Sequence, residues 1–185
     1  MQHHQLKMSI VAALFAAIIA IFAQLTIPLP LVPITGQTLA VGLAITILGL
    51  QYGTIAVTLY IALGAIGLPV FSGMSGGFGV IIGPTGGYII GFFVQALGMG
   101  LYLERFGYTK THALVANLIG MIITLIIGAL WLKLFMHLSW MQAFVTGVVA
   151  FVPVGILKAV IAGWFGSILR ERLIKARLLI VKSSY

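Results

Sequence analysis

Residues 8–27 read MSIVAALFAAIIAIFAQLTI and open a run in which no Asp, Glu, Lys or Arg occurs before Glu104. Soluble domains carry charges on about a quarter of their positions, whereas this chain is 62% hydrophobic and 6% charged, with a mean hydropathy of +1.22. In hydrocarbon the backbone must satisfy its own hydrogen bonds, and these continuous apolar runs lack the alternation of barrel strands. The sequence therefore predicts an all-α, polytopic membrane protein.

Proline, glycine and charged residues divide the chain into six expected spans. A bilayer requires about 20 apolar residues, or fewer where a helix packs against others, and the second and third spans are short. They cover residues 8–27, 36–50, 52–68, 84–103, 112–136 and 142–170, within a single domain over residues 1–185. We expect a tight turn over residues 49–53, a helix that starts at Pro84, and a break in the last segment at Pro153.

Six spans place both termini on one side of the membrane, and the basic residues indicate which side. Eight Lys and Arg residues fall on the side of the termini: Lys7, Arg105, Lys110, Arg170, Arg172, Lys175, Arg177 and Lys182. Lys133 falls on the other side, and Lys158 falls within the membrane. Because basic segments stay in the cytoplasm, we expect both termini to be cytoplasmic. This orientation accounts for the net charge of +8 without a nucleic-acid partner.

The expected outer connections are rich in proline and glycine. Residues 26–35 read TIPLPLVPIT, and residues 71–88 read FSGMSGGFGVIIGPTGGY. Irregular backbone at membrane depth is stable only where protein buries it or water reaches it, so we expect a cavity in the outer half of the bundle. The glycine-rich stretch lacks the Gly-Lys-Ser/Thr ending of a phosphate-binding loop, which argues against ATP binding.

Lys158 is the one charged residue expected inside the membrane. An isolated lysine there costs about 2.5–3.5 kcal/mol, which makes it a candidate functional residue. The only carboxylates, Glu104 and Glu171, lie at the cytoplasmic ends of spans, so a ligand carboxylate is a hypothetical counter-ion. The alternative is a side chain that snorkels toward the interface. Two peripheral carboxylates, no cysteine and four scattered histidines predict neither an enzyme site nor a metal site.

Small residues recur at every fourth position of the first expected span, at Ala12, Ala16 and Ala20. Such a stripe lets helices approach closely in lipid. It either packs inside the bundle or docks another membrane subunit, and the residues alone leave both interpretations open.

Several motifs follow one another in a familiar order. They are Val32-Pro-Ile-Thr-Gly-Gln-Thr-Leu39, YIALGAIGLPVF at residues 60–71, Ser75-Gly-Gly77 and Gly83-Pro-Thr-Gly-Gly-Tyr88. Over essentially residues 8–175 the chain resembles the BioY family, the biotin-specific S components of energy-coupling factor (ECF) transporters. The resemblance implies a protein of the prokaryotic plasma membrane that captures biotin from outside and uses no cofactor. Its implied partners are a transmembrane coupling subunit and two cytoplasmic ATPases.

The resemblance also implies the site. The expected ligand-binding residues are Gln37, Ser75, Gly76, Gly77, Tyr88, Gly155 and Lys158, and the family favours the stripe of Ala12, Ala16 and Ala20 as the docking face. Lys158 would bind the carboxylate or the ureido group of biotin. Three positions depart from the family pattern: Gly155 replaces an aspartate, Ser75 an asparagine and Ile89 an arginine, the last two being found in some members only.

Two other classes remain open at this stage. An S component for another carboxylate-bearing vitamin is the nearer one, because the expected site departs from the family pattern. A self-sufficient secondary carrier predicts internal repeats and paired ionisable residues along a path, of which only Lys158 is present.

Overall fold

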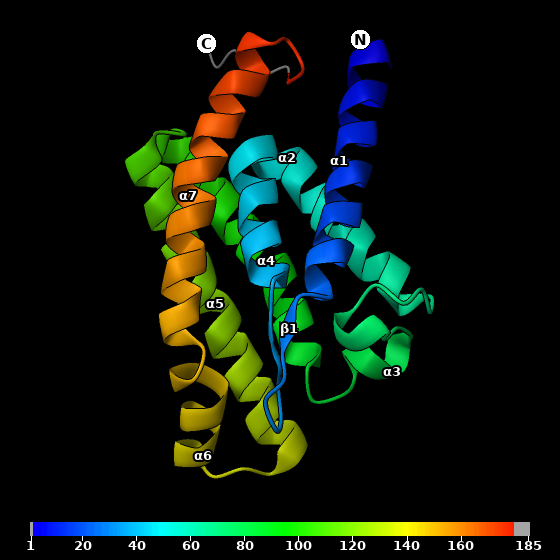
Figure 1. Cartoon of the computed structure of the whole chain (residues 1–185), viewed down its shortest axis with the longest axis vertical. Helices are drawn as coiled ribbons and strands as arrows, with labels where there is room; N and C mark the ends of the chain where they lie inside the picture. Colours follow the sequence, from blue (N-terminus) through cyan, green and yellow to red (C-terminus); the bar gives the residue numbers. More distant parts are fainter. Residues whose placement is uncertain (1, 180–185) are drawn as a thin grey trace.

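A computed structural model describes residues 2–179, which form a bundle of long apolar helices (Figure 1). Five helical segments of the described chain are long and apolar enough to cross a membrane. The long helices are α1 (Gln2–Ala23), α2 (Gln37–Ala65), α4 (Gly86–Phe106), α5 (Lys110–Met136) and α7 (Val152–Lys175). The short elements are strands β1 (Thr26–Ile27) and β2 (Ile34–Thr35), the 3-10 turn η1 (Ser72–Met74), helices α3 (Phe78–Ile81) and α6 (Trp140–Phe144), and the π-helical turn η2 (Val145–Val149).

The prediction of an apolar helical bundle is confirmed, and its outer surface explains the composition. Large apolar side chains are exposed on every long helix, including Leu14 at 59%, Ile126 at 52% and Phe165 at 59%. Contiguous apolar surface of this extent is incompatible with water and fits lipid tails. The chain is therefore described as a multi-pass membrane protein.

The second and third expected spans form α2, which is interrupted at Gly49. Gly49 has φ 82° and ψ −174°, whereas residues 51–53 are helical, so the expected turn over 49–53 is wrong and the break occupies one residue. A count of six requires the two halves of α2 to be taken separately. A positive φ is readily adopted only by glycine, which explains how so short a break can redirect the helix.

The break in α2 is closed by side chains from two other segments. Arg170 of α7 donates a hydrogen bond to the carbonyl of Ile47, two residues before the break. The guanidinium also lies 3.6 Å from the ring centroid of Tyr108, in the connection between α4 and α5. Burial raises the pKa of the Tyr108 phenol, so this residue remains neutral beside Arg170.

Two proline positions differ in outcome. The expectation that Pro84 starts a helix is wrong: Pro84 lies in a turn, where the Gly86 nitrogen donates to the Gly83 carbonyl at 3.0 Å, and α4 begins at Gly86. The break at Pro153 is confirmed, because α6 and η2 end in a turn and Pro153 stands in the first turn of α7. There the missing N–H of proline costs no helical hydrogen bond.

Helix α1 packs its small residues inward, onto α2. Ala12 and Ala16 are 0% and 2% exposed, and Ala20 is partly buried against the core. The expected docking face is therefore wrong, because these side chains are already covered within the chain. The small residues that α1 presents outward are Ser9, Ala13 and Ala17.

The two ends of the bundle carry different elements. Figure 1 shows α1 beginning and α7 ending at one end, with β1, α3 and α6 toward the other. Strands β1 and β2 pair in antiparallel register, Thr26 with Thr35 and Ile27 with Ile34, which ties down the proline-rich connection. Lys182, one of the residues in the orientation count, lies outside the described residues.

Candidate ligand-binding site

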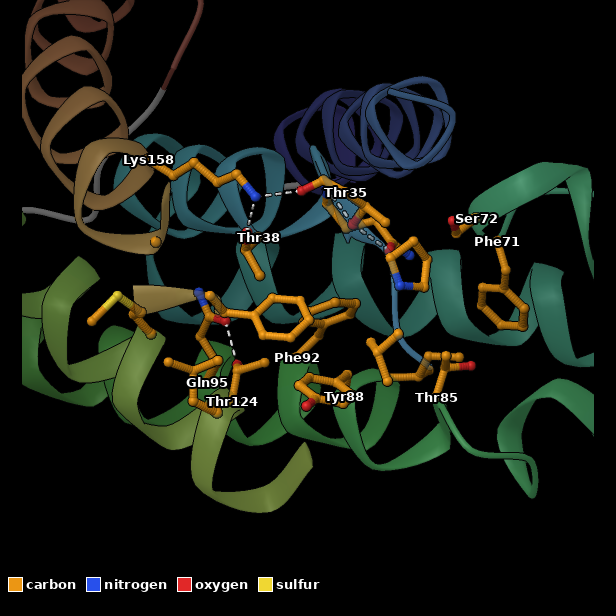
Figure 2. A pocket seen from close by; sticks show the side chains of 18 of the residues that line it. Thr35, Thr38, Phe71, Ser72, Thr85, Tyr88, Phe92, Gln95, Thr124 and Lys158 are labelled. Atoms are coloured by element: carbon orange, nitrogen blue, oxygen red, sulfur yellow. Dashed lines mark hydrogen bonds between the residues drawn. The ribbon is translucent and has the colours of Figure 1, made fainter. Parts of the chain in front are cut away.

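A cavity of about 250 Å³ lies among α2, α4, α5, α7 and the loops of the end opposite the chain termini (Figure 2). Most of its surface is apolar, and uncharged polar side chains together with Lys158 line the rest, a combination that suits a small-molecule site. The expected site residues Gln37, Ser75, Tyr88, Gly155 and Lys158 all line it. The cavity is thus found in the half of the bundle that carries the Pro- and Gly-rich connections.

Lys158 projects from α7 toward the start of α2. Its Nζ donates to the Thr35 carbonyl at 2.5 Å and to Thr38 Oγ1 at 3.3 Å. An ammonium group has three hydrogens, so one remains for a ligand. No carboxylate lines the cavity. Lys158 is therefore the cavity's single cationic side chain, held by neutral acceptors.

Gln37 is nearly buried at the first turn of α2, where two hydrogen bonds fix its amide. Its Oε1 accepts from the Thr35 hydroxyl at 2.7 Å, and its Nε2 donates to the Tyr60 hydroxyl. The Tyr60 ring in turn meets Phe71 edge to face, with 5.5 Å between centroids. Gln37 thus anchors the wall beside Lys158, and its two bonds leave one amide hydrogen without a partner among the described residues.

Aromatic side chains form the opposite wall. Tyr88 and Phe92 lie on consecutive turns of α4, and Tyr88 is 5.8 Å from Phe151 between ring centroids. The Tyr88 hydroxyl donates to the Gly147 carbonyl at 2.9 Å, so its polar atom is occupied by protein. Tyr88 therefore offers a ligand its ring rather than its hydroxyl group.

The glycine-rich loop contributes Phe71, Ser72 and Ser75 to the cavity. Ser75 donates its hydroxyl hydrogen to the Ser72 carbonyl at 2.7 Å, and the backbone of Phe71 pairs with that of Ser75. Gln24, after the last turn of α1, holds this segment from behind: it donates to the Phe71 carbonyl at 3.1 Å and accepts from the Met74 nitrogen at 2.9 Å.

Gly76 and Gly77 do not line the cavity, so their expected ligand contact finds no support in the structure. Gly77 has φ 97°, and its nitrogen donates to the Gly64 carbonyl at 2.7 Å. A side chain at Gly76 would collide with the carbonyl of Leu68. Both glycines shape the loop, which is a structural role that a sequence cannot separate from ligand contact.

Two of the positions that depart from the family pattern, Gly155 and Ile89, also line the cavity. A Cβ atom at Gly155 would lie 2.6 Å from Met121 Sδ, so the methionine occupies the space that a larger side chain would need. Ile89 is 3% exposed and adds apolar surface. Neither position contributes a charge or a polar side chain to the cavity.

Seven polar residues that line the cavity were not among the expected ligand-binding residues: Thr35, Thr38, Ser72, Thr85, Gln95, Asn117 and Thr124. The last three are the most deeply buried. Gln95 of α4 and Asn117 and Thr124 of α5 are 2%, 3% and 1% exposed and all line the cavity. These three could have been identified from the sequence, because a polar side chain in the middle of an apolar span is a candidate site residue. Within the described residues no three His, Cys, Asp or Glu side chains gather as a metal site would require.

Comparison with known proteins agrees with these observations. The model of the BioY family matches residues 1–175. The chain belongs to the BioY family. The match covers every element that lines the cavity.

Curated members of the family are similar over most of their length. The chain is 42% identical to the biotin transporter BioY2 of Lactococcus lactis subsp. cremoris (strain MG1363), over 90% of this chain and 91% of the relative. It is 38% identical to the biotin transporter BioY of Thermotoga maritima, over 85% and 92%. A crystal structure of the S-component for biotin from an ECF-type ABC transporter superimposes with a TM-score of 0.85 at 30% identity, over 92% of this chain and 94% of that one.

Proposed function

We propose that the chain is the biotin-binding S component of an ECF-type transporter in a prokaryotic plasma membrane. The proposal is carried by the cavity, which combines aromatic and aliphatic walls with a single cationic side chain. Biotin is a compact bicycle, in which a neutral cyclic urea is fused to an apolar sulfur-containing ring, and an aliphatic chain links that ring to a carboxylate; it matches that distribution. The named relatives and the similar crystal structure support the same ligand.

In this proposal, biotin binding depends on burial of its bicyclic ring system and on one charged contact, made by Lys158. The rings of Tyr88, Phe92 and Phe71 supply apolar contact. The remaining hydrogen of the Lys158 ammonium is directed to the ligand carboxylate. A buried charge is stable only when it is paired. Thr35 and Thr38 accept hydrogen bonds from Lys158 but carry no charge, so an anion in the cavity would supply the counter-ion.

The orientation follows from the basic residues: we place both termini in the cytoplasm and the cavity on the outer side. Biotin then enters from outside and leaves inward. The sequence contains no nucleotide-binding motif, so ATP-driven release requires a transmembrane coupling subunit and two cytoplasmic ATPases. On α1 the surface that can meet a partner in the membrane is the face of Ser9, Ala13 and Ala17, where small side chains permit close approach.

The test is binding by the purified protein in lipid nanodiscs, measured by calorimetry. We expect saturable binding of biotin and no binding of thiamine, which has no carboxylate. Pantothenate and lipoate, two other vitamins with a carboxylate, serve as competitors. Absence of biotin binding, or tighter binding of a competitor, would refute the proposed ligand.

A further inference from the structure

The floor of the cavity carries a second polar feature besides Lys158. Gln95, Asn117 and Thr124 face it from α4 and α5, and Figure 2 shows Gln95 and Thr124 on the wall opposite Lys158 and Thr38. Burying amides in an apolar bundle costs free energy wherever a hydrogen bond is missing. Open donors or acceptors at this floor therefore point to a ligand group that completes them.

Asn117 leaves an acceptor open. Its Nδ2 donates to Thr46 Oγ1 at 2.9 Å and to the Ala113 carbonyl at 2.8 Å. A carbonyl can only accept, which fixes the nitrogen on that side and uses both amide hydrogens. Oδ1 has no hydrogen-bond partner within residues 2–179. Thr54 is the one described residue with a fully buried, unbonded polar side-chain atom, so Asn117 Oδ1 is not sealed and touches open space.

Gln95 leaves a donor open. Its Oε1 accepts from the Thr124 hydroxyl at 2.6 Å, and its Nε2 donates one hydrogen to Met99 Sδ at 3.4 Å. Its second amide hydrogen has no partner in the described part of the chain. Gly120 fixes the side chain from α5, because a Cβ there would lie 2.8 Å from Gln95 Cγ. The amide is thus held in place with one N–H to spare.

Packing places these groups and Lys158 around one space. A Cβ at Gly42 of α2 would collide with Asn117 Oδ1 and lie 3.1 Å from the Cβ of Ala162 on α7. Three helices therefore converge at Asn117, about one helical turn along α7 from Lys158. The floor is neutral and mixes an acceptor with a donor, whereas Lys158 offers donors only.

We propose that Asn117 and Gln95 form the subsite for the urea of the ligand, an assignment that rests on the proposed biotin-binding function. Asn117 Oδ1 accepts a hydrogen bond from a urea N–H, and Gln95 Nε2 donates to the urea oxygen. A carboxylate could not fill this subsite, because it has no hydrogen for Asn117 Oδ1 and would face that oxygen with like partial charge. The ligand lies with its urea on the floor and its carboxylate toward Lys158.

The experiment compares three ligands and four proteins by calorimetry in nanodiscs. The ligands are biotin, 2-iminobiotin, in which an imine replaces the urea oxygen, and biotinamide, in which an amide replaces the carboxylate. The proteins are the wild type, Gln95→Met, Asn117→Leu and the control Thr54→Val, which removes a buried hydroxyl outside the cavity. Methionine and leucine keep the approximate volumes of the side chains that they replace.

Gln95→Met should weaken biotin about 5- to 100-fold, the usual cost of one lost hydrogen bond in a buried site, and should leave 2-iminobiotin nearly unchanged. Asn117→Leu should weaken biotin and 2-iminobiotin alike, since both keep their ring N–H groups. Neither variant should alter the preference for biotin over biotinamide, and Thr54→Val should bind all three ligands as the wild type does.

Biotin binding by the wild type together with unchanged ligand preferences in both variants would overturn the subsite and leave the proposed function intact. Absence of biotin binding by the wild type would instead refute the proposed function. If either variant does not fold, the affinities of the wild-type protein provide the test. Equal affinity of the wild type for biotin and 2-iminobiotin would overturn the role of Gln95.

Discussion

Lys158 and Thr35, 123 residues apart in the chain, are joined by a hydrogen bond of 2.5 Å from the lysine nitrogen to the threonine carbonyl. This contact ties α7 to the last residue of β2, and both residues line the cavity. Lys158 is therefore both a cation available to a ligand and a link between two elements that enclose it. A substitution at Lys158 has to distinguish its contact with the ligand from its contact with Thr35.

Lys158→Met keeps the length of the side chain and removes its charge. We expect biotin affinity to fall about 30-fold or more, as it does when one partner of a buried charged pair is lost. Biotinamide, which has no carboxylate, should lose much less. Lys133→Met is the matched control, because Lys133 lies outside the cavity, beside Trp140. An equal loss for biotin and biotinamide would assign Lys158 to loop anchoring rather than to the carboxylate.

Gln24 is predicted to control how long the ligand stays. Gln24→Leu removes the two hydrogen bonds that hold the Phe71 carbonyl and the Met74 nitrogen, and the loop segment behind the cavity loosens. We expect biotin to dissociate about tenfold faster, because two net hydrogen bonds of about 0.5–1.5 kcal/mol each are lost.

The association rate in Gln24→Leu should change little, since no ligand contact is removed. Gln51→Leu, at an exposed glutamine of α2, is the control for apolar substitution. Hydrogen exchange at residues 71–75 provides the readout that distinguishes positioning from general instability. Faster dissociation of biotin without faster hydrogen exchange at residues 71–75 would contradict this role of Gln24.

The helices could be predicted from the sequence because lipid leaves the backbone few alternatives. The face of α1 that packs against the core could not be predicted in this way. Its lipid face and its core face are both apolar, so Ala12 and Ala13 are equivalent in the sequence, and only packing on α2 decides that Ala12 is 0% exposed. In a soluble helix, polarity would have shown which face is buried.

The site was predictable in part for a related reason. Lys158 is conspicuous in any apolar span, and the amides of Gln95 and Asn117 were visible in the same way but weaker as signals, since an uncharged amide costs less to bury than a charge. The contrast between Ser75 and Gly76, neighbours in one motif, depends on how the loop folds against Leu68. Loop geometry of that kind is set by tertiary contacts, so it was beyond the reach of the sequence.

Partner docking is predicted to depend on the outward face of α1. Ala13→Leu together with Ala17→Leu should abolish copurification with the coupling subunit and the ATPases, because the larger side chains keep a partner helix at a distance. Biotin binding by the isolated protein should persist, since both alanines are exposed. Ala150→Leu, at another exposed alanine, is the control. An intact complex carrying both substitutions would exclude this face.

Gly49 is predicted to be required for the break in α2. Gly49→Ala should destabilise the protein by about 1–3 kcal/mol through its backbone conformation alone. A further cost arises because the new Cβ would lie 2.8 Å from the Tyr108 hydroxyl. Gly107→Ala is a matched comparison, with φ 92° and open space around it, so it isolates the backbone contribution. Thermal unfolding in detergent gives the stability of both variants. Equal destabilisation would show that the Tyr108 side chain moves aside at no cost in free energy.

The orientation can be tested directly because the chain has no cysteine. Ser139→Cys precedes α6 at the end of the bundle that carries the cavity loops, and Lys110→Cys starts α5 at the end that carries the termini. In intact cells a membrane-impermeant maleimide should label Ser139→Cys and spare Lys110→Cys until the membrane is permeabilised. Both positions are exposed, so a difference in labelling reports sidedness rather than burial. The reverse pattern would put the cavity on the cytoplasmic side and would make the protein unsuited to uptake.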